Sequence, residues 1–274
     1  MSKKSFFIFK VLITIISFVA ILISKSTIDW SNIWNNTIDS LLLKESIYDI
    51  SVGIFSAMVL VWFIDEINER IKIKQTKQAE NETILRFDKI NQKYIDRYKA
   101  LFYCTVTPIS DRTKPADLMP SQILLKDMKD LYKTTLLIIQ DSSESSVSSF
   151  FQIEEALRQQ FIRQIEKNDF VYNTKIYNLL SKYIEISIGY DCRSAIMKIP
   201  QKTIGNEPAI TAIEKMLEKN ADEYFGDLQK GKSNHSNLMY PYIILRQMML
   251  EERDVILQYE EEINKIKKNQ SAKN

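Results

Sequence analysis

The chain has 274 residues, a formal net charge of +2 and 45% apolar residues, with only five glycines and six prolines. So few turn-forming residues disfavour an all-β fold, because its many short strands need frequent turns. The nearly neutral charge argues against a nucleic-acid-binding domain, which normally carries a strong basic excess. We therefore expect an all-α protein with room for one substantial helical domain.

Two apolar stretches near the N-terminus, residues 6–24 and 47–64, are each long enough to cross a bilayer. A hydrocarbon core of about 30 Å needs roughly 17 to 25 apolar residues in a helix. The charge in each stretch, Lys10 or Asp49, lies near an end, where it can reach the headgroups. A cleaved signal sequence is the alternative for the first stretch, but signal peptides have shorter apolar regions and end in small residues. We predict a transmembrane hairpin over residues 1–64.

The loop between the spans, residues 25–46, is predicted to lie outside the cell. Lys3 and Lys4 precede the first span and four basic residues follow the second, and positive flanks tend to stay cytoplasmic. We therefore expect a multi-pass protein of the inner or plasma membrane with both termini in the cytoplasm. Trp30 and Trp34 are predicted interfacial anchors, either on a short helix at the outer surface or in an ordinary loop.

Small and polar residues of the two spans are predicted to pack helices together. Gly53 and Ala57 form a small-xxx-small pair with Ser51 and Ser56 beside them, and the first span offers Ser17. Such residues let helices approach closely and form hydrogen bonds in lipid. Packing between the two spans of one chain is the simpler interpretation, and packing between neighbouring chains is the alternative.

The inner end of the hairpin is predicted to hold an ion pair. Antiparallel pairing of the two spans brings Lys10 to the depth of Asp65, at the cytoplasmic interface of the membrane. Beyond that point the second span is expected to continue as a helical stalk over residues 65–104, since residues 72–83 are almost entirely polar.

Residues 105–274 are predicted to form a cytoplasmic helical bundle. Three prolines make residues 105–120 a loop. Apolar residues at spacings of three and four then predict helices, whose apolar stripes we interpret as core faces. These helices are expected at about residues 124–138, 150–161, 170–188, 210–224 and 240–268.

No residues in the chain are arranged as a recognisable catalytic or metal site. The two cysteines, Cys104 and Cys192, are far apart in the sequence and are interpreted as buried apolar residues. The single histidine, His235, lies in a polar stretch without a positioned nucleophile. We therefore expect no enzyme activity, no metal and no cofactor.

Residues 226–233 match the P-loop pattern G-x-x-x-x-G-K-[ST], with Gly226, Gly231, Lys232 and Ser233 at its fixed positions. In a P-loop the backbone surrounds phosphate, the lysine reaches the outer phosphates and the hydroxyl meets magnesium. That motif requires a strand before it and a helix after it, whereas here a helical pattern precedes it and a loop pattern follows. Nucleotide binding is therefore a remote alternative.

In its layout of two spans and a cytoplasmic helical domain, the chain resembles the two-span inner-membrane effectors of bacterial anti-phage systems, including those associated with retrons. The resemblance transfers no functional residue. It implies that the cytoplasmic helices sense or bind a partner and control the hairpin, as in a membrane-disrupting defence effector or toxin. The alternative is a passive membrane anchor or scaffold for a helical interaction domain.

The expected partners follow from this layout. They are the lipid bilayer, further copies of the chain in a homo-oligomer, and a cytoplasmic protein or nucleoprotein. Direct nucleic-acid binding is not expected, because the chain lacks a strong basic excess.

Overall fold

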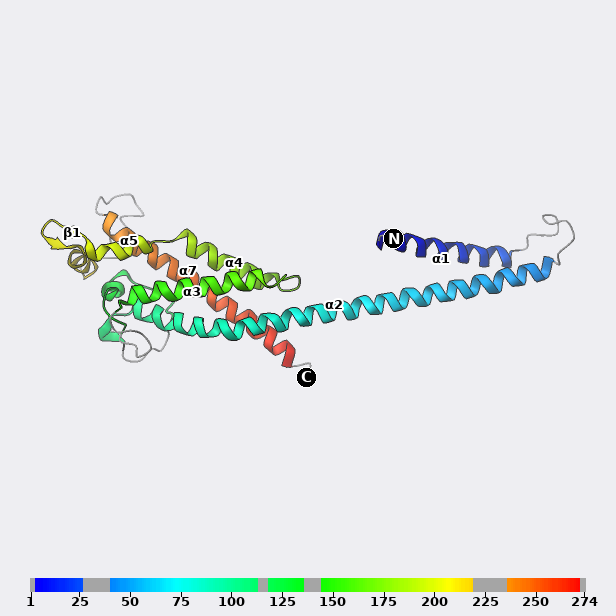
Figure 1. The fold of residues 1–274 in the computed structure, drawn as a ribbon, viewed down its shortest axis with the longest axis horizontal. Coiled ribbons are helices and arrows are strands. Elements are labelled where there is room, and N and C mark those ends of the chain that lie inside the picture. Colours follow the sequence, from blue (N-terminus) through cyan, green and yellow to red (C-terminus); the bar gives the residue numbers. More distant parts are fainter. Residues whose placement is uncertain (1–2, 27–39, 113–117, 136–143, 219–235, 272–274) are drawn as a thin grey trace. The chain divides into compact units, whose positions relative to one another are not determined.

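The computed structural model describes residues 3–26, 40–112, 118–135, 144–218 and 236–271 (Figure 1). This part of the chain is mostly helical, which confirms the predicted all-α class. It divides into two compact units, Met1–Thr76 and Lys77–Asn274, which are described separately below. We call them the hairpin unit and the helical unit.

The hairpin unit consists of helix α1 (Lys3–Lys25) and the first part of helix α2 (Ser40–Val106). Both helices are long and apolar enough to cross a membrane. Their large apolar side chains are mostly exposed, among them Ile16 at 59%, Leu60 at 60% and Phe63 at 69%. Such a continuous apolar surface is unfavourable in water and is typical of helices surrounded by lipid.

Helix α2 is continuous for 67 residues because nothing in its sequence breaks it. It contains no proline and only one glycine, and i,i+4 pairs such as Glu66 with Arg70 support its exposed turns. The helix ends just before Pro108, which disfavours helix at the preceding residue. Arg112 then donates hydrogen bonds to the carbonyls of Cys104 and Thr107, so these carbonyls at the end of the helix have hydrogen-bond partners.

The helical unit begins within α2, and this corrects the predicted stalk over residues 65–104. The helix does continue inward from the second apolar stretch, but Ile84, Ile95 and Tyr98 are fully buried. Residues 77–104 therefore belong to the helical unit and contribute one buried face to its core, and the boundary lies at Thr76 instead of residue 104. The sequence shows that this part of α2 has an apolar face, but its periodicity does not show that neighbouring helices cover that face.

Helices α3 (Ser146–Glu166), α4 (Thr174–Gly189) and α7 (Ser236–Ser271) pack against this part of α2, and the short helix α5 (Arg193–Lys198) contacts α7 (Figure 1). Aromatic rings join them. Tyr98 of α2 lies 5.3 Å from Phe150 of α3 and 6.4 Å from Tyr183 of α4, measured between ring centroids. Phe161 of α3 lies 5.5 Å from Tyr259 of α7. This aromatic centre fixes the four long helices of the unit against one another.

The connection between α2 and α3 differs from the predicted helix over residues 124–138. Within the described part of residues 124–138 the structure has the 3-10 helix η3 (Leu125–Asp130), and a shorter one, η2 (Ile109–Asp111), precedes it. The buried residues Leu125, Met128 and Leu131 are spaced by three, so a helix with three residues per turn points all of them at the core.

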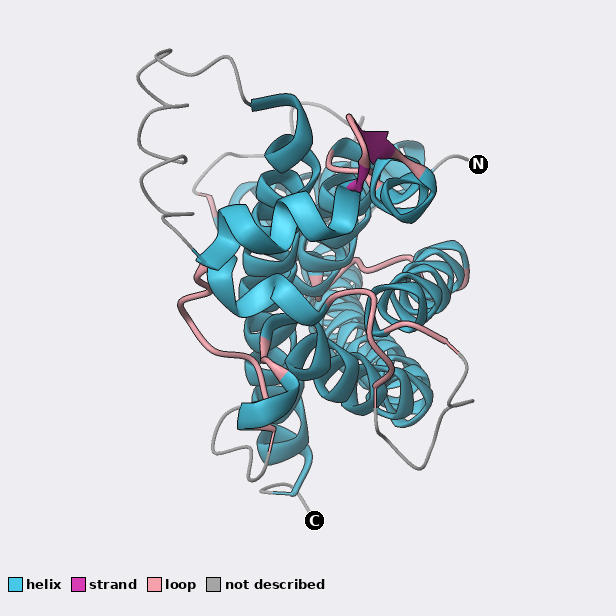
Figure 2. Cartoon of the chain, turned by 90° about the vertical axis from the view of Figure 1, so that its left-hand side faces the viewer, coloured by secondary structure: helices cyan, strands magenta, loops and turns pink. Residues whose placement is uncertain are grey.

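A short β-hairpin between α5 and residues 209–218 was not predicted. Helix η4 (Ile199–Gln201) leads into strands β1 (Thr203–Ile204) and β2 (Glu207–Pro208), which pair antiparallel. Gly205 in the turn has a φ of +59°, a conformation that glycine adopts at little cost. Within the described residues, this hairpin is the part drawn as strand, in magenta, in Figure 2.

Candidate functional site

The two helices of the hairpin unit contact each other in one antiparallel register. Ser26 at the end of α1 accepts a hydrogen bond at its carbonyl from Lys44 of α2, at 3.2 Å. Ring and cation contacts follow along the pair, at Lys25 with Tyr48, Phe18 with Phe55 and Phe7 with Trp62. The first helix therefore lies along the second over its full described length.

At the other end of this register, Lys10 Nζ forms an ion pair with Asp65 Oδ2, the pair predicted from the sequence. The Lys10 side chain is only 12% exposed, whereas that of Asp65 is 54% exposed. A lysine inside an apolar helix is costly unless its ammonium reaches a partner or the interface. Asp65 supplies that partner one residue after the apolar stretch ends.

The predicted packing residues of the hairpin divide into two sets. Ser17 is 4% exposed and Ser51 is 6% exposed, so both are buried in the hairpin unit. Gly53, Ser56 and Ala57 are exposed, and apart from adjacent residues and nearby backbone of α2 itself, no atom lies within 4 Å of a side-chain carbon built at Gly53. The Gly53 face therefore makes no contact with the first span in this structure, and its packing against a neighbouring chain remains a prediction.

Several predicted residues lie outside the described part of the chain. They are the anchors Trp30 and Trp34, His235, and the P-loop-like residues Gly226, Gly231, Lys232 and Ser233. Among the residues that the structure does describe, no cluster of histidine, cysteine or acidic side chains is arranged to hold a metal.

Both cysteines are free and buried, as interpreted from the sequence. Burial raises the pKa of the Cys192 thiol to about 12 and also raises the pKa of Cys104. Thiols with raised pKa values stay protonated near neutral pH and are poor nucleophiles. The two residues therefore act as small apolar residues in the core.

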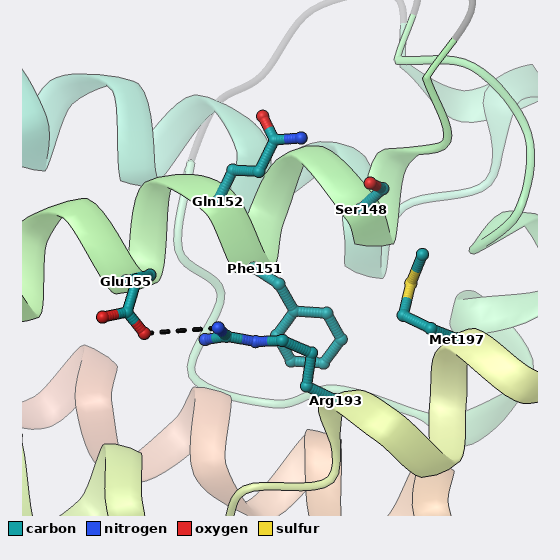
Figure 3. Close-up of a pocket in the computed structure, with 6 residues that line it drawn as sticks. All are labelled: Ser148, Phe151, Gln152, Glu155, Arg193 and Met197. Atoms are coloured by element: carbon teal, nitrogen blue, oxygen red, sulfur yellow. Dashed lines mark hydrogen bonds and ion pairs between the residues drawn. The ribbon is translucent and has the colours of Figure 1, made fainter.

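A cavity of about 330 Å³ lies between α3 and α5, lined by Ser148, Phe151, Gln152, Glu155, Arg193 and Met197 (Figure 3). The Arg193 guanidinium lies over the Phe151 ring, 5.3 Å from its centroid. It donates to Glu155 at 3.2 Å and to the buried Glu154 at 2.8 Å. Arg193 is thus the connection between the short helix α5 and two carboxylates of α3.

Behind Arg193 lie two buried carboxyl groups. Glu154 accepts a hydrogen bond from Ser187 of α4, and Glu252 of α7 accepts one from Tyr98 at 2.7 Å. Burial raises the pKa of Glu154 and raises that of Glu252 well above its ordinary value of 4.5. Burial therefore favours the protonated, uncharged form of Glu252.

This polar centre joins α2, α3, α4, α5 and α7, and sequence reasoning missed it. The signal was present, because Glu251 and Glu252 interrupt the apolar stripe of the last helix. The network links these helices through buried hydrogen bonds and an ion pair. No protein-family model, curated protein or solved structure matches this chain.

Proposed function

We propose that this chain is a multi-pass protein of the bacterial inner membrane that acts as a membrane-disrupting defence effector or toxin. In this proposal the helical unit is cytoplasmic, binds a protein or nucleoprotein partner, and controls the hairpin. The observation that carries it is the continuity of α2, which supplies both an apolar span and a central part of the helical core.

Continuity matters because a partner that repacks the core must act on α2. Ile95, Tyr98 and Phe102 of this helix are fully buried, and Tyr98 contacts side chains of α3, α4 and α7. An α-helix without proline resists bending. A shift or rotation of this buried part is therefore transmitted along the backbone to residues 47–64.

The hairpin supports a role beyond anchoring. One membrane span is enough to anchor a protein, so anchoring alone does not explain a second span or an ion pair between the two. Lys10 and Asp65 fix the register of α1 against α2. The open face around Gly53 and Ala57 is free for a second copy of the chain, because small residues let membrane helices approach closely. We propose that homo-oligomers form through this face when the partner is bound.

The proposal is tested by inducible expression in bacteria, with and without phage infection, using a dye that reports membrane potential. We expect the wild-type chain to depolarise cells and Gly53→Leu to abolish depolarisation, because the larger side chain keeps helices apart. Val59→Leu is the matched control, since Val59 is 49% exposed on the same helix and already carries a large side chain. Immunoblots of the membrane fraction must show equal amounts of all three proteins.

Unchanged membrane potential and growth for the wild type under both conditions would contradict the effector proposal and leave the passive anchor or scaffold. Equal depolarisation by wild type and Gly53→Leu would contradict only the proposed role of the Gly53 face and would leave the effector proposal standing.

A further inference from the structure

A second groove of the helical unit lies between α2 and the end of α7 and has a volume of about 410 Å³. It is lined by Glu82, Leu85, Arg86, Lys89, Lys267 and Gln270. The four α2 residues are spaced by three, one and three, so they share one side of that helix. The groove is thus built from two elements that are far apart in the sequence.

Lys267 is held in place by a buried carboxylate. Its ammonium lies 2.8 Å from Asp88 Oδ2, and the Asp88 side chain is only 1% exposed. The other oxygen of Asp88 accepts a hydrogen bond from Gln92 at 3.2 Å. Because Lys267 and Asp88 neutralise each other, the ammonium is fixed at the groove without adding net charge.

The remaining two cations are not neutralised. Arg86 and Lys89 are exposed, and neither has an ion-pair partner among the described residues. Glu82 lies one turn before Arg86, but its carboxylate accepts a hydrogen bond from Gln78 at 3.1 Å, on the turn before that. The groove therefore presents the guanidinium of Arg86 and the ammonium groups of Lys89 and Lys267. The carboxylate of Glu82 also lines it but is hydrogen-bonded to Gln78.

We propose that this groove binds a phosphate group, a function separate from the control of the hairpin. Glu82 offsets one of the two charges of Arg86 and Lys89, so the groove keeps a net positive charge that attracts a phosphate, which carries about −1.5 to −2 charges near neutral pH. The planar guanidinium of Arg86 binds two phosphate oxygens at once, while Lys89 and Lys267 contribute point charges. Leu85 supplies an apolar wall for the rest of the ligand.

Two sources offer this chemistry, a free phosphorylated molecule and the headgroup of an anionic phospholipid. The full chain is placed in nanodiscs of neutral phosphatidylcholine and titrated calorimetrically with inorganic pyrophosphate at low ionic strength. In parallel it is floated with separate vesicles of phosphatidylcholine, with or without phosphatidylglycerol. A response to pyrophosphate identifies a free ligand, and a response to phosphatidylglycerol alone identifies the lipid.

The double variant Arg86→Gln/Lys89→Gln is expected to weaken binding of the active probe by at least about tenfold, because it removes two charge-assisted contacts. The control Lys93→Gln/Lys182→Gln removes the same charge from exposed positions outside the groove and is expected to change binding by less than about twofold. Circular dichroism melting of both variants checks that they are folded.

A footprint on the wild-type chain makes the test independent of the variants. The bound probe is expected to slow acetylation of Lys89 and to leave that of Lys93 unchanged. The proposal is overturned if neither probe binds at low salt or if both double variants weaken binding equally. Binding of a single-stranded oligonucleotide alone, without either probe, overturns it as well.

Discussion

The buried carboxyl of Glu252 makes a sharp prediction about pH. Its folded-state pKa lies well above that of an unfolded glutamate, so its contribution to stability is complete below about pH 4.5 and is lost as the pH rises toward the folded pKa. Over that window the loss is about 1.4 kcal/mol per pH unit. Glu252→Gln removes this dependence while retaining an oxygen that accepts from Tyr98. As the pH rises above about 4.5, the variant should therefore gain stability relative to wild type, until the folded-state pKa of Glu252 is reached.

The measurement is amide hydrogen exchange of α3 and α7 in the full chain, between pH 5 and pH 8, corrected for intrinsic exchange. Glu154 has a raised pKa too, so part of the slope remains in Glu252→Gln. Groups with lowered pKa values, such as Asp130 and Glu262, lose their contribution only as the pH falls through their folded pKa and leave this window unaffected. Glu251→Gln controls for removal of a neighbouring, partly exposed carboxylate. A Glu252→Gln slope equal to that of wild type would refute a raised pKa of Glu252.

Two further experiments probe the ion pairs. Arg193→Met keeps an apolar side chain over Phe151 but leaves Glu154 buried without the cation it pairs with. The helical unit should therefore lose about 2 kcal/mol of stability at pH 7 and less at pH 5. The same exchange experiment measures this loss. A double-mutant cycle with Lys10→Met and Asp65→Asn should give a coupling energy of about 1 kcal/mol in unfolding of the hairpin by sodium dodecyl sulfate, because Asp65 is half exposed. A cycle with no coupling would show that the pair does not stabilise the hairpin.

The features predicted from the sequence are those that a short window of residues determines. Bilayer thickness sets the length of an apolar stretch, so residues 6–24 and 47–64 were identified without any knowledge of their neighbours. The pairing of Lys10 with Asp65 follows from the same counting, because an antiparallel hairpin has one free parameter, its register. The helical segments and the all-α class also follow from local properties, namely composition and the spacing of apolar residues.

The features that were missed depend on distant residues. Residues 84–102 carry a helical apolar stripe, but only the packing of α3, α4 and α7 decides that this stripe is core and not the face of a stalk. Leu125, Met128 and Leu131 fit a 3-10 helix because of where the core lies, which their spacing alone does not reveal. The interruption of a stripe by Glu252 is visible in the sequence, yet its partner Tyr98 is 154 residues away.

The position of the buried acids connects these observations to the proposed control of the hairpin. Tyr98 belongs to α2 and Glu252 to α7, so their hydrogen bond ties the helix that continues into the apolar span to the last helix of the core. A buried polar contact is directional, and misalignment leaves both groups without partners at a cost of about 1 to 3 kcal/mol. Apolar contacts around it tolerate small shifts at lower cost. A partner that moves α7 would therefore favour discrete positions of α2, which is the behaviour that a two-state effector requires.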